Sequence, residues 1–408
     1  MKNHKLFITI TLLASCFVGN VVAQVQNQSV ALATCENRVT FENWLQKFKQ
    51  DARNSGITQQ TLDLVANELV YNPEVIKRDR NQNVFQQTFI QFADRMASDS
   101  RRLGAVKRIT ITYKDLFAKV EKDFGVPPAI IAAFWALESD FGASTGKFKI
   151  LSAAATLAYD CRRADKFRAQ ALDAIRLVQR GDIAPEEMIG NWAGELGGTQ
   201  FMASDYFESG IDYDQDGKVN LVKSIPDTIA TSGNYLAKKG WKAGEPWMQE
   251  VKVPSQMAWE EADISIQHSK SEWAKMGVRP ISGKWDGENL PASLILPMGR
   301  LGSAFLVYPN FRFILAWNES VTYSTTAAYL ALRITGAPAM QHGSEDIKNL
   351  TQEQIKELQT YLVNHGFNIG AVDGKLGAVT KSAVKQLQLQ LKLPADSYPT
   401  FELLTLLR

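Results

Sequence analysis

The sequence is poor in the residues that most often bind transition metals. It has three cysteines and four histidines in 408 residues. The histidines stand alone in the sequence, at His4, His268, His342 and His365. None has a partner at the spacing that a zinc site requires, and no cysteine pair has such a spacing either. The composition therefore excludes the common zinc-site patterns.

An excess of charge of one sign is also missing. The chain has 45 lysines and arginines against 43 aspartates and glutamates, and Lys2 and Lys5 account for the difference. This balance predicts no nucleic-acid partner and no attraction to an anionic membrane. An apolar content of 45% with 22% charged residues is ordinary for a soluble globular chain. The length is sufficient for two or three domains.

The apolar stretch over residues 6–23 is too short to span a membrane, which takes about 20 apolar residues, and polar side chains interrupt it. Two lysines precede the stretch, and small residues up to Ala23 fit cleavage before Gln24. We therefore predict a signal peptide over residues 1–23 and an exported mature protein.

A second interpretation of this segment remains open. Residues 13–16, Leu-Ala-Ser-Cys, resemble the lipobox of bacterial lipoproteins, whose cysteine is acylated. Lipidation at Cys16 would give an outer-membrane lipoprotein, the one case in which we expect a membrane contact. We favour simple cleavage and a periplasmic protein, because residues 17–23 stay mostly apolar where a mature lipoprotein turns polar.

Two cysteines remain in the mature chain. An oxidising compartment allows a disulfide between Cys35 and Cys161. This bond would tie the amino-terminal segment to the domain beside Arg162 and Arg163. The alternative is two unpaired, buried thiols.

The most informative segment is GVPPAIIAAFWALESDFG, residues 125–142. Pro128 suits a first helical position, and Gly142 is a plausible stop. Counting back from Glu138 by three, four and seven residues reaches only bulky apolar side chains. A carboxyl group against hydrophobic walls has a raised pKa, which makes Glu138 a candidate general acid of the kind that glycosidic cleavage needs. The alternative is a surface glutamate near a helix end.

The pattern of apolar residues predicts a mainly α chain of the α+β class. We expect helices within residues 41–120 and at 128–141, 167–180, 229–239 and 323–334. Short apolar runs predict a small β element at 292–296, 305–308 and 311–317. A proline and two glycines indicate a linker over residues 336–344.

Several blocks together resemble a known family. They are residues 125–142, TLAYDCRRADKFRAQ at 156–170, the segment from GNWAGELGGTQFM to NYLAKKGW at 190–241, and LVYPNFRFILAWNES at 306–320. In this order they resemble the B-type lytic murein transglycosylases. The resemblance implies a lysozyme-like helical catalytic domain over residues 36–335.

The end of the chain carries a second resemblance. Residues 358–396, LQTYLVNHGFNIGAVDGKLGAVTKSAVKQLQLQLKLPAD, are similar to the small helical peptidoglycan-binding domain of cell-wall hydrolases. This implies a three-helix binding domain over residues 345–408. Leu387 replaces a common aromatic and Ser397 a common glycine, which affects the expected binding strength more than the fold. The alternative is that the glycine-rich loop only shapes a turn.

The first resemblance implies that the protein cleaves the MurNAc–GlcNAc bond of peptidoglycan glycan strands and leaves 1,6-anhydro ends. Glu138 would act first as acid and then as base, with no cofactor required. Glu195 is the nearest second carboxylate, but no obvious hydrolytic role falls to it. The alternatives are a hydrolytic muramidase, and a non-catalytic scaffold that binds peptidoglycan. Other cell-wall enzymes are expected as further partners.

The resemblance also implies substrate contacts. Arg162 and Arg163 would bind carboxylates of muramic acid or its peptide, unless they are merely solvated. Contacts to the saccharide would come from Gln200, Ser204, Trp317 and Asn318. Trp317 stands where the family more often has tyrosine, so we expect a tyrosine hydroxyl contact near Glu138 to be absent.

An acidic segment follows the D-x-D-x-D-G spacing of a calcium loop. Its twelfth position is lysine rather than glutamate, so the pattern is incomplete, and the family's late acidic ligand corresponds to Asp227. The expected calcium ligands are Asp212, Asp214, Asp216, Lys218 through its carbonyl, and Asp227. The alternative is an Asp-rich turn held by its own backbone hydrogen bonds.

Overall fold

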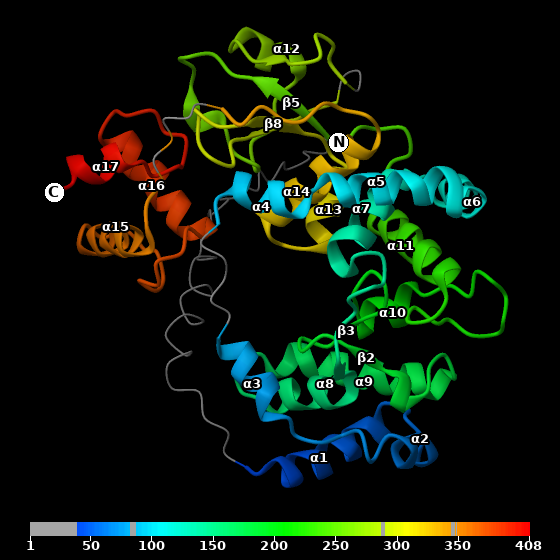
Figure 1. Cartoon of the computed structure of the whole chain (residues 1–408). Helices are drawn as coiled ribbons and strands as arrows, with labels where there is room; N and C mark the ends of the chain where they lie inside the picture. Colours follow the sequence, from blue (N-terminus) through cyan, green and yellow to red (C-terminus); the bar gives the residue numbers. More distant parts are fainter. Residues whose placement is uncertain (1–38, 82–86, 287–289, 344–346, 348) are drawn as a thin grey trace, which may run out of the picture. The chain divides into compact units, whose positions relative to one another are not determined.

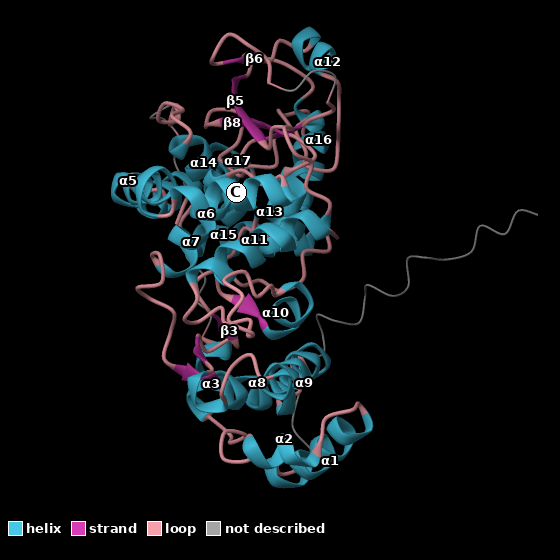
Figure 2. Ribbon diagram, turned by 90° about the vertical axis from the view of Figure 1, so that its right-hand side faces the viewer, coloured by secondary structure: helices cyan, strands magenta, loops and turns pink. Residues whose placement is uncertain are grey.

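The computed structural model describes residues 39–81, 87–286, 290–343, 347 and 349–408 (Figure 1). The predicted signal peptide, Cys16 and Cys35 lie outside these ranges. Helices dominate the described chain, and its strands form two small antiparallel sheets (Figure 2). The predicted mainly helical fold is therefore confirmed. Within the described ranges, every helix is too short or too polar to cross a bilayer.

The first helices begin at residues whose side chains cap them. Thr40, Thr58, Asn72, Thr88 and Ser98 each accept a hydrogen bond from a backbone N–H of the first turn. These helices and the π-helical turn η2 have the following bounds: α1 Phe41–Asn54, α2 Gln59–Leu64, α3 Pro73–Arg80, α4 Phe89–Met96, α5 Asp99–Lys107, η2 Arg108–Thr112 and α6 Lys114–Phe124.

Helix α7, Pro128–Ser139, is central to the core. Pro128 occupies its first turn, as expected, and ten of its twelve residues are buried. It packs against α5, α6 and two later helices, α11 (Ile225–Lys239) and α14 (Val321–Ile334). A helix that is apolar on every side is stable only when other elements surround it, which explains why α7 is almost fully buried.

The first sheet has the strand order β1-β2-β3-β4, and each strand is two residues long. Gly190 allows β2 to approach β3 closely, because a Cβ atom there would lie 2.0 Å from the carbonyl oxygen of Glu195. The strands and the elements between and after them have these bounds: β1 Phe148–Lys149, α8 Ile150–Tyr159, α9 Ala164–Arg180, η3 Pro185–Glu187, β2 Ile189–Gly190, β3 Glu195–Leu196, β4 Phe201–Met202 and α10 Ala203–Ser209. Helix α11 starts four residues before its predicted start, because Ser224 caps it.

The second sheet has the order β6-β5-β8-β7 and a hydrophobic core of its own around Trp273 and Leu306. Its elements have these bounds: β5 Met248–Lys252, η4 Trp259–Glu261, α12 Lys270–Lys275, β6 Arg279–Pro280, β7 Ser293–Ile295 and β8 Ala304–Val307.

The prediction of a strand over residues 311–317 is wrong. This run is helix α13, Phe311–Trp317, and it buries Phe311 and Ile314, which lie one turn apart. A short apolar run does not distinguish a buried strand from a buried helix by its pattern alone. The predicted helix at 323–334 is confirmed by α14.

The carboxy-terminal unit has the three predicted helices and its own core, which includes Leu358, Val384 and Leu403. Its helices are α15 Gln352–Asn364, α16 Ala378–Gln390 and α17 Phe401–Leu406. The buried amide of Gln359 holds the loop between α15 and α16, because it accepts from the N–H of Gly374 (2.7 Å) and donates to the Lys375 carbonyl (3.1 Å).

Candidate active site

Glu138 lies in the last turn of α7, next to an unusual backbone turn. The helix ends after Ser139, because Asp140 and Phe141 have left-handed conformations with φ values of 51° and 62°. Non-glycine residues rarely adopt this conformation. The guanidinium of Arg108 lies 3.8 Å from the centre of the Phe141 ring and holds the turn in place. The helix therefore stops three residues before the expected glycine, and Glu138 is fixed at its end.

Two aromatic residues hydrogen-bond the carboxyl group of Glu138. Tyr323 donates from its hydroxyl, and Trp317 donates from its indole N–H at 3.2 Å, both to Oε1. The pKa of Glu138 is raised to about 8: burial is the main cause, the charge of Glu195 adds to the rise, and the hydrogen bonds from Tyr323 and Trp317 oppose it. Glu138 is therefore mostly protonated at neutral pH, as a general acid must be.

Tyr323 is a site residue that sequence reasoning missed. We expected no tyrosine hydroxyl near Glu138, because Trp317 replaces the usual tyrosine; the structure shows that Tyr323 supplies this contact. Burial, and next the charge of Glu138, raise the pKa of Tyr323, so it stays a protonated donor. The only feature of the sequence that could have indicated this contact is the position of Tyr323, six residues after Trp317 and in the first turn of α14.

The indole of Trp317 is part of an aromatic cluster. It stacks on Phe134 with centroids 4.1 Å apart, and Phe201 and Tyr235 contact it at 4.8 and 5.4 Å. Neighbouring Asn318 accepts a hydrogen bond from the Ser320 N–H at 3.0 Å. The cluster fixes the orientation of the indole ring, so that its N–H donates to the carboxyl group of Glu138.

Glu195 lies close enough to Glu138 for its charge to affect the pKa there. It stands in β3, where Asn191 donates to its carboxylate and accepts from its backbone N–H at 3.1 Å. Burial raises the pKa of Glu195, and the charges of Lys166 and Arg163 lower it. The structure therefore brings Glu195 within electrostatic range of both Glu138 and Arg163.

The predicted saccharide contacts Gln200 and Ser204 also have structural partners. Gln200, at φ 52°, donates from its amide to the carbonyls of Gly197 (2.8 Å) and Thr145 (3.2 Å). Ser204 donates to Asp173 at 2.6 Å. Their contacts with a saccharide stay predictions.

Arg162 and Arg163 both donate to Asp79, whose side chain is almost fully buried. Arg80 joins the cluster at 2.7 Å from the same carboxylate. The two predicted arginines keep 25% and 33% of their side chains exposed, so they are not merely solvated.

The adjacent Cys161 is disulfide-bonded, and the predicted partner lies outside the described residues.

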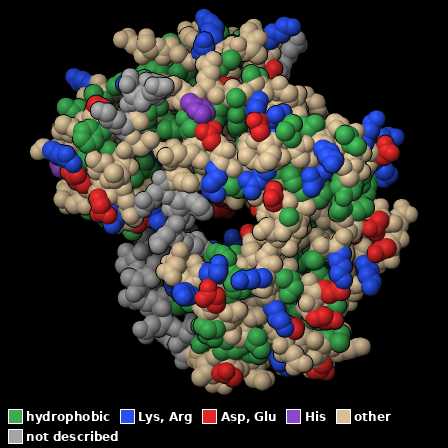
Figure 3. Space-filling view, in the orientation of Figure 1, with side chains coloured by type: hydrophobic (Ala, Val, Ile, Leu, Met, Phe, Trp, Pro, Cys, Tyr) green, Lys and Arg blue, Asp and Glu red, His purple; other side chains and the backbone are tan. Residues whose placement is uncertain are grey.

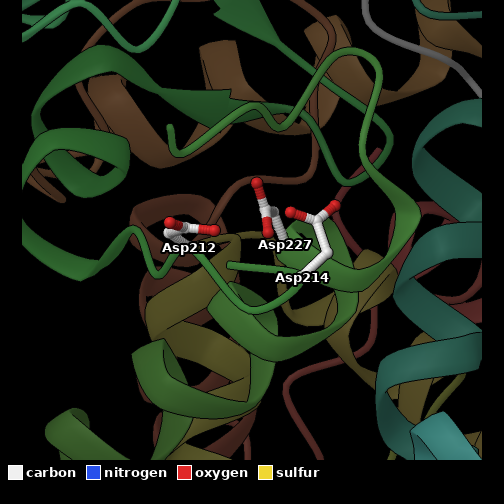
Figure 4. A group of neighbouring side chains, drawn as sticks. All are labelled: Asp212, Asp214 and Asp227. Atoms are coloured by element: carbon white, nitrogen blue, oxygen red, sulfur yellow. The ribbon is translucent and has the colours of Figure 1, made fainter. Parts of the chain in front are cut away.

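Three of the predicted calcium ligands come together. Oxygen atoms of Asp212, Asp214 and Asp227 lie within 4.8 Å of one another, between the acidic loop and the first turn of α11 (Figure 4). Asp216 instead accepts from the N–H of Lys218 at 2.9 Å. Carboxylate oxygens at this separation suit a hard cation such as Ca²⁺, so the donor set fits the metal.

Comparison with protein families decides the assignment. The family model described as "Transglycosylase SLT domain" matches residues 40–332. The chain belongs to this family. A model described as "Putative peptidoglycan binding domain" matches residues 351–407, in agreement with the three-helix unit. Both resemblances drawn from the sequence are confirmed.

Individual members of the family agree with the assignment. Membrane-bound lytic murein transglycosylase B of Escherichia coli K12 is 30% identical over 214 residues, which cover 52% of this chain and 58% of that protein. The chain thus spans little more than half of this relative.

Solved structures extend the similarity. SltB3 from Pseudomonas aeruginosa, in complex with NAG-anhNAM-pentapeptide, is 34% identical with a TM-score of 0.84, over 90% of this chain and 99% of that one. Lytic transglycosylase Slt35 of Escherichia coli, in complex with calcium, is 25% identical with a TM-score of 0.63, over 72% of this chain and 92% of that one.

Proposed function

We propose that the protein is a lytic transglycosylase that cleaves the β-1,4 bond between MurNAc and GlcNAc in peptidoglycan. One observation carries the proposal: the partly buried carboxyl group of Glu138, whose pKa is raised to about 8, accepts hydrogen bonds from Tyr323 and Trp317. The SltB3 complex with an anhydro-muramic saccharide supports the same reaction.

The reaction needs one group that gives and then takes a proton. Glu138 protonates the glycosidic oxygen, and the bond from that oxygen to C1 of MurNAc breaks. The resulting carboxylate removes the proton of the C6 hydroxyl, and O6 forms a new bond to C1. The product is a 1,6-anhydro ring, and no water is consumed. Tyr323 and Trp317 stabilise the carboxylate between the two steps, because charge-assisted hydrogen bonds are stronger than neutral ones.

Hydrolysis with retention would require a second carboxylate, ionised and about 5 Å from the acid. Glu195 fits this role poorly, because Asn191 donates a hydrogen bond to its carboxylate, which lowers the nucleophilicity of that group. The geometry thus favours transglycosylation over a muramidase reaction.

Substrate contacts follow from the same proposal. Arg162 and Arg163, which also contact Asp79, would bind carboxylates of muramic acid. A saccharide bound beside Glu138 would contact Gln200, Ser204, Trp317 and Asn318. Residues 36–335 would form the catalytic domain, residues 336–344 the linker, and residues 345–408 a domain that holds the enzyme on its insoluble substrate. Export to the periplasm through residues 1–23 is part of the proposal.

We also propose that Asp212, Asp214 and Asp227 bind one structural calcium ion. Unneutralised carboxylates this close repel one another, and a cation removes the repulsion. The calcium complex of the related Slt35 supports this site. The ion would brace the loop before α11 and would take no part in the reaction.

The decisive experiment compares the mature protein with Glu138→Gln on purified peptidoglycan sacculi, with released products identified by mass spectrometry. We expect muropeptides one water lighter than reducing ones, and at least a thousandfold less product from the variant, as is typical for loss of an essential group. The matched control is Glu121→Gln, an exposed glutamate on α6. Reducing ends would indicate a muramidase, and Glu138-independent binding without cleavage would indicate a scaffold.

A further inference from the structure

A pocket of about 510 Å³ lies at the edge of the first sheet. Glu138 does not line it. Its walls come from β1 and the residue before it, from Ser152 of α8, and from α3 and the segment that leads into it. The side chains that matter most are those of Tyr71, Arg78, Lys147, Phe148 and Lys149.

The pocket carries an excess of positive charge. Arg78, Lys147 and Lys149 line it, against one acidic residue, Glu74. Arg78 pairs with Glu74 at 3.1 Å, and Lys149 pairs with Glu68 at 2.9 Å. Lys147 is exposed, and no described residue pairs with its ammonium group. On the face that Figure 3 shows, basic and acidic side chains are interspersed. The pocket therefore suits a ligand with carboxylate groups.

Aromatic rings give the pocket a fixed apolar wall. The Arg78 guanidinium lies 5.3 Å from the centre of the Phe148 ring. Tyr71 is 43% exposed, and its inner side is held by edge contact with Tyr159 at 5.8 Å. A rigid ring with one open face contacts a peptide at little entropic cost.

The backbone also leaves an open edge here. β1 is the outer strand of its sheet and pairs only with β2 among the described strands. Ile150 donates to the Met188 carbonyl at 2.9 Å, so by alternation the N–H of Lys149 points away from β2. Exposed strand edges bind extended peptides through such groups.

The pocket is connected to the candidate active site through a short segment. Gln200 donates to the carbonyl of Thr145, and Lys147 follows two residues later. Since consecutive Cα atoms lie about 3.8 Å apart, the Cα of Lys147 is at most about 8 Å from that of Thr145. A peptide attached to a sugar beside Gln200 therefore has a short path to the pocket.

We propose that this pocket binds the acidic stem peptide of a peptidoglycan strand, in an extended conformation along β1. The proposal rests on the proposed function, because it places the peptide relative to a saccharide in the active site. Lys147 binds a carboxylate of the peptide, and the rings of Tyr71 and Phe148 contact its alkyl parts.

The test uses the full mature chain with Lys147→Glu and Lys147→Ala, on two substrates: glycan strands with stem peptides, and the same strands after an amidase has removed them. We expect KM for the peptide-bearing strands to rise about tenfold in Lys147→Glu and less in Lys147→Ala, with kcat unchanged. KM for the bare strands stays the same. The matched control is Lys122→Glu, an exposed lysine on α6 outside the pocket.

A second measurement does not depend on cleavage. Calorimetric titration of the full chain with the free peptide L-Ala-γ-D-Glu-meso-diaminopimelyl-D-Ala, which has three carboxylates and two ammonium groups, should show binding that Lys147→Glu weakens about tenfold. Equal KM values for Lys147→Glu and Lys122→Glu, or an equal rise on both substrates, would overturn the proposal. If the wild-type protein cleaves neither substrate, the proposed function fails, and the titration still decides whether the pocket binds the peptide.

Discussion

At the scale of single residues, Glu138 is subject to opposing influences. Burial and the charge of Glu195 favour its protonated form, whereas the hydrogen bonds from Tyr323 and Trp317 favour the carboxylate. A group that must act as acid and then as base benefits from such a balance, because neither form is strongly preferred.

This balance predicts opposite shifts in two variants. Tyr323→Phe removes a donor to the carboxylate, so the pKa of Glu138 rises, and the alkaline limb of kcat/KM, which we expect near pH 8 in the wild type, moves to higher pH. Glu195→Gln removes a negative charge, so the limb moves to lower pH. We also expect kcat of Tyr323→Phe to fall about tenfold, the value of one hydrogen bond to a charged group. The measurement is a pH–rate profile on soluble glycan strands.

The matched comparison is Tyr329→Phe, a change in the same helix at a hydroxyl that bonds the backbone N–H of Met340. Tyr329→Phe should leave the alkaline limb of kcat/KM at the same pH as in the wild type. Shifts of the same sign in Tyr323→Phe and Glu195→Gln would contradict the assigned roles.

At the scale of elements, the local sequence pattern was sufficient to predict helix α7, whereas long-range packing determined the contacts of Glu138 and the conformation of residues 311–317. The buried end of α7 was predictable, because the spacing of apolar residues around Glu138 lies within one helix. The contact with Tyr323 was not, because the two residues lie 185 positions apart. The run Phe311–Trp317 has six apolar residues in seven positions, which carry too little periodicity to distinguish a strand from a helix; packing of Phe311 and Ile314 makes it a helix.

The loop before α11 predicts a calcium effect on stability. At a calcium concentration of about one hundred times Kd, binding stabilises the folded state by about 2.7 kcal/mol, or about 3 °C in Tm for a chain of this size. Asp227→Asn should abolish this increase, because it removes one charge from the converging group. Thermal denaturation with calcium and with a chelator is the measurement.

Asp216→Asn is the control for the loop. Asp216 belongs to the acidic motif but lies outside the converging group, so its variant should keep most of the calcium-dependent increase. A wild-type Tm that is the same in calcium and in chelator would exclude the site, whatever the basal Tm of the variants.

At the scale of the whole molecule, the carboxy-terminal unit contacts the rest of the described chain through polar groups and through Tyr398 and Ile347, which join the main hydrophobic cluster. The buried carboxylate of Asp396 accepts from the backbone N–H of Arg300 at 2.9 Å, and Lys385 pairs with Asp263 at 3.0 Å. Arg300 and Asp263 keep about a third of their side chains exposed. Water can therefore replace the polar contacts if the unit is removed, and the main cluster loses only these two of its many apolar side chains, so the catalytic part should remain folded.

Removal of residues 345–408 should separate binding from chemistry. Two linked binding sites give an effective concentration that one site lacks, so we expect sedimentation with sacculi to weaken at least a hundredfold, while kcat/KM on short soluble glycan strands changes less than twofold. Asp373→Ala, which breaks the contacts of Asp373 with Gln359 and Lys375, should weaken sacculus binding in the full-length chain. Unchanged sedimentation of the truncated chain with sacculi would mean that the catalytic part alone is sufficient to bind the cell wall. Lost activity on soluble strands would mean that the carboxy-terminal unit contributes to the site around Glu138.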